Sequence, residues 1–296
     1  MTPGFAAFRL SPVESVKSGS LVVFGVSSNP LPPGRSGTAD GPAALREASV
    51  EQLQPYFESP SGSVVDLHRR ITRKLRSGDI GFDLGDIGLV ETRRETARKS
   101  VAVLTTQILD RGAVPVVLGG DGLAADSMLR AIFQAAPETA LIRFAPQVPS
   151  PDQTAMVKRG ALLCIGVNGL QPMPAWRSVE SGNHSIRTST SIDDRGVETA
   201  KDEIRSFLDK QGATTLHIDM GVLDTGHAAG TPIVNIGGLT PEQFVELLGA
   251  VSGHELAGVV ITNTAPGLDA RGITEHAAAA GLLAAIGGHL HEEMRL

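Results

Sequence analysis

Short apolar runs that alternate with helical patterns constrain the fold of this chain more than any other feature. Leu21–Val26 is continuously apolar, as expected of a strand whose two faces are both covered. Other expected strands include residues 63–67, 114–118 and 213–218, whereas residues 91–112 carry apolar side chains at helical spacing. About eight strands alternate with helices, the pattern of parallel sheets with helices on both faces. We therefore predict an α/β fold, a single three-layer α-β-α sandwich with a mostly parallel, about eight-stranded sheet.

Size and charge narrow the possible functions. The 296 residues fit one large α/β domain, which we place at residues 21–296 after a poorly patterned lead-in at residues 1–20. The net charge is 26 − 32 = −6 and there is no Lys/Arg patch, so we expect no nucleic-acid partner. The longest apolar run, residues 277–287, is too short to span a bilayer, and we expect no membrane partner.

The single cysteine, Cys164, excludes an intrachain disulfide and a cysteine-rich zinc site. It lies in the apolar run 161–165, which predicts a buried and unreactive thiol. The chain does not open on a cationic segment followed by an apolar stretch, the pattern of a signal peptide. We therefore expect a cytoplasmic, reducing location.

Acidic residues follow the ends of several expected strands. One strand ends at Asp219, with Asp224 in the turn-rich segment beyond it, and Asp121 lies in the glycine-rich turn 119–122. Because α/β folds place their sites at the carboxyl ends of parallel strands, all three aspartates are candidate catalytic residues. Asp121 also fits a helix N-cap and Asp224 a turn residue that accepts backbone N–H bonds. The turn 119–122 precedes a helix and can bind an anion there.

A series of motifs resembles, in order, the landmarks of the ureohydrolase family, which includes arginase, agmatinase and formimidoylglutamase. The similarity spans residues 21 to about 290. The motifs are the loop and helix with Gly25, Gly34 and 41–46, the Asp83-Leu84-Gly85-Asp86 strand end, Gly119-Gly120-Asp121, the strand 165–169, the segment 218–224 with glycines at 230 and 237–238, and the segment 266–274. Together they resemble the family over most of its fold.

The resemblance implies hydrolysis of guanidino or amidino groups by two manganese ions that bridge a hydroxide. The family supplies Asp and His ligands from three strand ends. At the six matching positions this chain has Gly122, Ala145, Gln147, Pro149, Asp219 and Gly221, so only one carboxylate remains. Asn263 matches the family's substrate-binding glutamate. Because hard divalent cations need several carboxylate or imidazole ligands, we predict that the metal site is lost and manganese is not bound.

We interpret the chain as an arginase/agmatinase-like pseudoenzyme with a structural, regulatory or small-ligand-binding role and no cofactor. The resemblance also implies a homo-oligomer, a trimer or a hexamer, or association with an active paralogue. A small polar ligand is a further possible partner, bound in the pocket where family members hold their substrate.

Three alternatives stay open. In the first, an enzyme reuses the old pocket for metal-independent chemistry on a guanidino or amino-acid-like metabolite, with Asp219, Asp121 or Asp224 as acid or base. A buried carboxylate without a metal should then have a raised pKa. In the second, His217 or His227 joins Asp219 in a new one-metal site. In the third, the chain is an ordinary manganese ureohydrolase.

Overall fold

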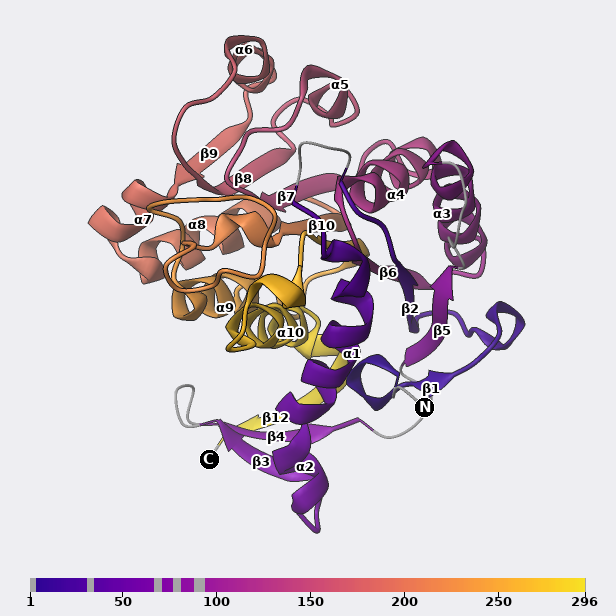
Figure 1. The fold of residues 1–296 in the computed structure, drawn as a ribbon. Helices are drawn as coiled ribbons and strands as arrows, with labels where there is room; N and C mark the ends of the chain where they lie inside the picture. Colours follow the sequence, from indigo (N-terminus) through magenta and orange to yellow (C-terminus); the bar gives the residue numbers. More distant parts are fainter. Residues whose placement is uncertain (1–3, 31–34, 67–70, 77–80, 88–93, 296) are drawn as a thin grey trace.

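The computed structural model describes residues 4–30, 35–66, 71–76, 81–87 and 94–295 (Figure 1). Gly34 of the N-terminal motif, residue 67 at the end of an expected strand and residues 91–93 at the start of an expected helix lie outside these ranges.

A nine-stranded sheet forms the middle layer of the molecule. In spatial order its strands are β1 (Arg9–Leu10), β5 (Gly81–Ile87), β2 (Leu21–Val26), β6 (Val114–Gly119), β11 (Leu256–Thr262), β10 (Thr214–Asp219), β7 (Ala140–Phe144), β8 (Leu162–Val167) and β9 (Ser185–Thr188). Neighbouring strands in it pair in parallel throughout the part of the chain that the structure describes. The predicted three-layer α/β fold with a mostly parallel sheet is confirmed, with nine strands in place of about eight.

Helices cover both faces of this sheet (Figure 1). One face packs against α1 (Gly41–Gln52), α7 (Ser189–Arg195), α8 (Val197–Leu208), α9 (Pro241–Gly249) and α10 (Ile273–Ala285). The other packs against α3 (Arg94–Leu109), α4 (Gly122–Ala135), α5 (Pro151–Thr154) and α6 (Met173–Ser181). Two further short helices are α2 (Gln54–Glu58) and α11 (Gly287–Leu290).

Strand β2 shows why its sequence is continuously apolar. Its six residues are all buried, and successive side chains point to opposite faces of the sheet. Leu21 and Val23 join the core beneath α1 and α10, whereas Val22, Phe24 and Val26 join the core beneath α3 and α4. Each such side chain stabilises the fold by about 1.5–3 kcal/mol through removal from water.

A second, antiparallel sheet departs from the predicted alternation. It contains β3 (Ser63–Asp66), β4 (Ile71–Leu75) and β12 (His291–Arg295), with β4 in the middle. The strand expected at residues 63–67 therefore exists but belongs to this small sheet. The lead-in also contributes to the fold, because the Phe5 side chain is fully buried and its N–H donates to Asp83 Oδ2 at 2.8 Å.

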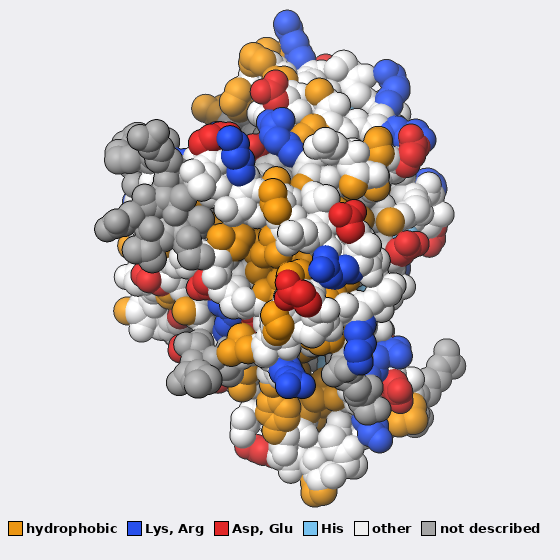
Figure 2. Space-filling model, turned by 90° about the vertical axis from the view of Figure 1, so that its right-hand side faces the viewer, with side chains coloured by type: hydrophobic (Ala, Val, Ile, Leu, Met, Phe, Trp, Pro, Cys, Tyr) orange, Lys and Arg blue, Asp and Glu red, His pale blue; other side chains and the backbone are white. Residues whose placement is uncertain are grey.

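Positive and negative side chains are mixed on one side of the molecule (Figure 2). Figure 2 shows one side of the molecule, on which Lys and Arg side chains are interspersed with Asp and Glu and hydrophobic side chains gather near the middle. Among the described residues, no helix has both the length and the apolar character needed to cross a membrane.

His291, at the start of β12, makes the small sheet sensitive to acid. The residue is 6% exposed, and its ring stacks on Tyr56 with ring centroids 5.0 Å apart. Burial, assisted by the positive charge of Arg73, lowers the pKa of His291 from 6.5 to about 4. As pH falls, the unfolded chain therefore binds the proton first. We expect the contribution of His291 to stability to be complete above about pH 6.5 and to be lost towards about pH 4.

Urea unfolding of the wild type and of His291→Phe, measured between about pH 7.5 and pH 4.5, checks this prediction. Phenylalanine keeps an apolar ring against Tyr56 but cannot titrate. The variant should lose less stability than the wild type across this range. Equal losses in the two proteins would contradict the assignment to His291.

Candidate functional site

Four adjacent strands bring the candidate residues to one edge of the main sheet. In the order β6, β11, β10 and β7, they end near Asp121, Asn263, Asp219 and Ala145. The register pairs Asp219 with Thr262 on one side and Ile218 with Phe144 on the other. The carboxyl ends of these strands form the edge at which parallel α/β folds bind ligands.

Asp219 is buried and its Oδ1 is already occupied. This oxygen accepts hydrogen bonds from the backbone N–H of Gly221 and from Asn263 Nδ2, each at 2.9 Å. Asn263 has φ = 65°, in the left-handed region that asparagine tolerates better than most residues. Burial raises the pKa of Asp219, although the bond from Asn263 and the charge of Arg143 oppose the rise. The predicted raised pKa is confirmed in direction.

Arg143 lies on β7, beside Asp219 at the end of the neighbouring strand β10. The sequence patterns did not single it out. The residue is 8% exposed, and its Nε–H donates to His217 Nδ1 at 3.3 Å, while Nη1 donates to the backbone oxygen of Gln147. Its signal in the sequence was a charged residue inside an otherwise apolar strand, since fully buried arginine is rare unless it is paired. The register places Arg143 directly opposite His217.

The bond from Arg143 fixes the tautomer of His217. Because Nε of arginine can only donate, Nδ1 of His217 must accept and its proton must reside on Nε2. Nε2 faces Thr262 Oγ1 at 3.5 Å. Burial, with the charge of Arg143, holds the pKa of His217 well below its usual range. His217 is therefore neutral, and each of its ring nitrogens faces a protein group.

Asp121 belongs to a neighbouring cluster with a structural role. It is the N-cap of α4, where its Oδ1 accepts from the N–H of Leu123 at 3.3 Å and from Ser28 Oγ at 2.7 Å. Its Oδ2 pairs with Arg94 Nη2 at 2.7 Å. The predicted N-cap is confirmed, and both carboxylate oxygens of Asp121 have partners.

Asp224 holds the loop beyond β10 in place, as a turn residue. Its two oxygens accept from the N–H groups of Gly226 at 2.8 Å and Gly237 at 2.6 Å. Burial alone would raise the pKa of Asp224, but the bonds from Gly237 and Gly226 outweigh it and lower the pKa. His227 is exposed and lies 3.6 Å from Asp224 Oδ1. In the described part of the chain, no hydrogen bond or ion pair joins Asp224 to Asp219.

Four of the positions predicted to match the family's ligands carry neither a carboxylate nor an imidazole. Gly122 is the exposed first residue of α4, and a Cβ added there would meet open space. Ala145 and Pro149 are buried after β7, and the side chain of Gln147 is exposed. Within the described ranges, no group of three or more His, Cys, Asp or Glu side chains is placed to hold a metal ion.

Gly221, the fifth of these positions, is closely packed. A Cβ added at Gly221 would lie 2.8 Å from Ile233 Cδ1 and 3.1 Å from Asp219 Oδ1. The space that a larger side chain would need is therefore filled by Ile233 from the loop after β10.

Cys164, on β8, behaves as its apolar surroundings predicted. The thiol is fully buried, and burial raises its pKa to about 11. A thiol with this pKa is protonated at neutral pH, so it is not a nucleophile.

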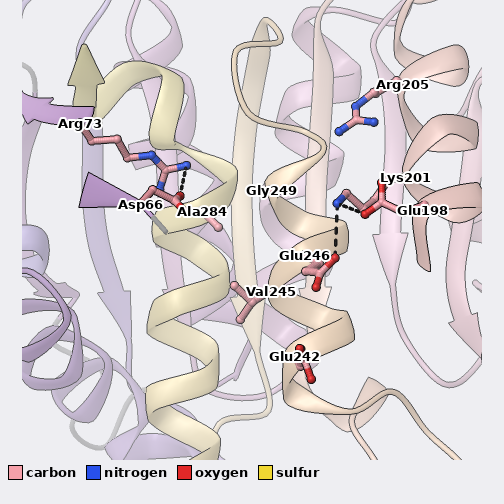
Figure 3. A pocket seen from close by; sticks show the side chains of 10 residues that line it. All are labelled: Asp66, Arg73, Glu198, Lys201, Arg205, Glu242, Val245, Glu246, Gly249 and Ala284. Carbon is pink, nitrogen blue, oxygen red and sulfur yellow. Dashed lines mark hydrogen bonds and ion pairs between the residues drawn. The ribbon is translucent and has the colours of Figure 1, made fainter. Parts of the chain in front are cut away.

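A groove of about 520 Å³ lies away from these strand ends (Figure 3). It is lined by α8, α9, α10 and the small sheet. Lys201 Nζ points between Glu198 and Glu246, at 2.6 and 3.3 Å, and Arg73 pairs with Asp66 at 3.2 Å. Lys201 and Arg73 already have carboxylate partners, so neither side chain is available to bind an anionic ligand in the groove.

The sequence was compared with protein-family models and with curated proteins, and both comparisons found related sequences. The family model described as the arginase family matches residues 20–145 and 150–287. The formimidoylglutamase of Bacillus subtilis (strain 168) is 25% identical over 296 aligned residues, which cover 93% of this chain and 88% of that protein. The agmatinase of Proteus mirabilis is 24% identical over 288 residues, covering 93% and 89%.

Solved structures share the fold. The proclavaminate amidino hydrolase of Streptomyces clavuligerus superposes with a TM-score of 0.78 at 20% identity, covering 98% of this chain and 97% of the other. The arginase of Bacillus caldovelox gives 0.73 at 20% identity, covering 91% and 98%.

Proposed function

Because this chain belongs to the arginase family, whose model matches most of its length, we propose that it is a pseudoenzyme of that family. In this proposal it has lost the dimanganese site and the metal-dependent hydrolysis of guanidino groups. Its remaining role is structural, regulatory or the binding of a small ligand.

The buried guanidinium of Arg143 is the observation that carries the proposal. It lies beside the one carboxylate that remains at the former ligand positions, and its charge acts on Asp219. A divalent cation at Asp219 would meet a permanent positive charge in a poorly solvated place, where repulsion between like charges is strong. Arg143 thus supplies a positive charge where an active member would bind metal ions.

The donor groups that are present do not fit two manganese ions. Hard cations of this kind need several oxygen or imidazole ligands. Asp219 Oδ1 already accepts two hydrogen bonds, and Nδ1 of His217 already accepts from Arg143. A metal ion on Nδ1 of His217 or on Oδ1 of Asp219 would compete with these bonds, and His227 lies near Asp224 instead.

Metal analysis after manganese loading tests the proposal. The purified protein, incubated with manganese and then desalted, should retain well below one equivalent and release no urea from arginine or agmatine. An active manganese arginase taken through the same steps is the positive control. Two tightly bound equivalents together with urea release would overturn the proposal.

Metal-independent chemistry is the second candidate function. The raised pKa of buried Asp219 favours it, because a carboxyl group that keeps its proton to a higher pH is better suited to act as a general acid. Asp219→Asn distinguishes the two candidates if a substrate is found. Unchanged specific activity in this variant would exclude Asp219 as the catalytic acid or base.

Partners and location complete the proposal. We propose that the chain forms a homo-oligomer or associates with an active paralogue. We also propose that it works in the reducing cytoplasm, where its one buried cysteine stays a free thiol.

A further inference from the structure

Arg143 is a buried cation that has no carboxylate partner among the residues that the structure describes. Other arginines that are buried or half-buried are paired: Arg46 Nε lies 2.8 Å from Asp83, and Arg94 Nη2 lies 2.7 Å from Asp121. Within the described ranges, no Asp or Glu oxygen lies within 4 Å of the Arg143 guanidinium. A buried charge of this kind is costly to a protein unless something pairs with it.

The hydrogen bonds of Arg143 leave most of its donors unused. A guanidinium has five N–H donors in a planar fork. Nε donates to His217, and one Nη1 hydrogen serves the backbone oxygen of Gln147. The second Nη1 hydrogen and both Nη2 hydrogens make no hydrogen bond to the residues that the structure describes. These donors lie at the Nη end of the fork, the end that can hold two oxygens of one anion.

The neighbours of Arg143 leave its charge uncompensated at short range. His217 is neutral because it accepts the Nε hydrogen bond, and Oδ1 of Asp219 is committed to Gly221 and Asn263. No oxygen of Asp219 lies within 4 Å of the guanidinium nitrogens, so Asp219 influences Arg143 through space without pairing with it. Arg143 keeps 8% of its surface exposed, so it is deeply placed but not sealed from solvent.

We propose that Arg143 anchors a binding site for a small carboxylate-bearing ligand at the carboxyl ends of β7 and β10. This inference rests on the proposed function and names its ligand class. The planar carboxylate matches the free Nη end of the fork in shape and charge. The position also matches the edge of the sheet where open parallel folds bind ligands. The ligand supplies the counter-ion that the described part of the chain does not place beside Arg143.

Acetate is the simplest probe of this site. Thermal unfolding of the full chain is followed in a chelator, with sodium acetate replacing sodium chloride at constant ionic strength, so that screening does not change. We expect a saturable rise in Tm of about 2 °C or more. Arg143→Gln should weaken acetate affinity by at least about tenfold, because it removes the charged donors. Arg187→Gln, which removes an arginine paired with Glu203, should leave acetate affinity unchanged.

Further variants keep the test decisive if Arg143→Gln does not fold, as judged by circular dichroism. Arg143→Lys retains the charge without the fork and should bind acetate more weakly than the wild type. Asp219→Asn removes the negative neighbour and should bind acetate more tightly. No saturable shift in the wild type, an equal shift in both Arg143 variants, or a response to inorganic phosphate but not to acetate would each overturn the inference.

Metal content measured on the same samples separates this inference from the proposed function. Absence of an acetate effect in protein that still excludes manganese would overturn the ligand site alone. Protein that binds two manganese equivalents would overturn the proposed function, whatever acetate does.

Discussion

Replacing Asp83 with asparagine is expected to lower the free energy of unfolding by about 3–5 kcal/mol. Asp83 is fully buried and holds Arg46 through both oxygens, Nε to Oδ2 at 2.8 Å and Nη2 to Oδ1 at 3.0 Å. Asp83 also accepts the N–H groups of Phe5 and Gly85, each at 2.8 Å. Asparagine would leave the Arg46 guanidinium largely buried without its carboxylate, and the remaining pair with Asp86 is half-exposed. The loss is therefore much larger than that of a surface ion pair.

Urea unfolding measures this effect against a matched control. Arg130→Gln removes an exposed helical pair, Arg130 Nε to Asp126 Oδ2 at 3.1 Å, which should contribute only about 0.3–0.5 kcal/mol. The double variant Arg46→Met with Asp83→Leu should recover part of the loss, because it removes both charges together. Recovery should be incomplete, since Phe5 and Gly85 would still lack an acceptor. A change below about 1 kcal/mol in Asp83→Asn would show that the pair contributes little.

The same ion pair shows what the sequence motifs could and could not predict. The segments 41–46 and 83–86 were recognised separately, as two landmarks of one family. Their contact follows from the parallel pairing of β2 with β5 and from α1 packing over the sheet, which no local pattern encodes. A motif identifies residues of interest more readily than it identifies their partners.

The main sheet was predictable because its strands are apolar on both faces. Among the short or half-exposed strands, β3 was predicted, but β9, β4 and β12 were not. β9 and β4 are only partly buried, and β12 pairs with β4 across more than 200 residues, as in the pairing of His291 with Leu75. Their stability comes from non-local contacts, so their sequences lack a strong period. The N-terminal Phe5 was missed for the same reason, because its burial depends on Asp83 and on the Ser49 hydroxyl that accepts the N–H of Ala6.

The candidate site residues also differ in whether their partners are local or distant in sequence. Asp121 and Asp224 bond to backbone amides nearby in sequence, so their turn roles could be predicted from local patterns. The partners of Asp219 were harder to foresee, because Asn263 and Arg143 come from neighbouring strands. A lone arginine inside an apolar strand signals an unusual position, but only the register against His217 shows what the arginine does.

Placing a carboxylate at position 221, as in Gly221→Asp, is expected to destabilise the protein by about 3–5 kcal/mol in the absence of metal. The new Cβ would lie 2.8 Å from Ile233 Cδ1, so Ile233 must move or the loop after β10 must shift. The carboxylate would also lie beside buried Asp219, and like charges in such a place raise the pKa of an acid. An acid whose pKa is raised on folding costs stability increasingly as pH rises from its unfolded pKa to its folded pKa. The penalty of Gly221→Asp should therefore be smallest near about pH 4 and grow towards neutral pH.

Two control variants separate packing from charge in this experiment. Gly221→Asn has nearly the same shape without the charge, and its penalty, measured by urea unfolding, should change little with pH. Gly122→Asp places a carboxylate at an exposed helix N-terminus in open space, where it should cost almost nothing. If manganese returned Gly221→Asp to wild-type stability, one added ligand would be enough to rebuild a metal site. We expect no such rescue, because the positive charge of Arg143 would still oppose the ion and positions 122, 145, 147 and 149 would still lack carboxylate and imidazole ligands.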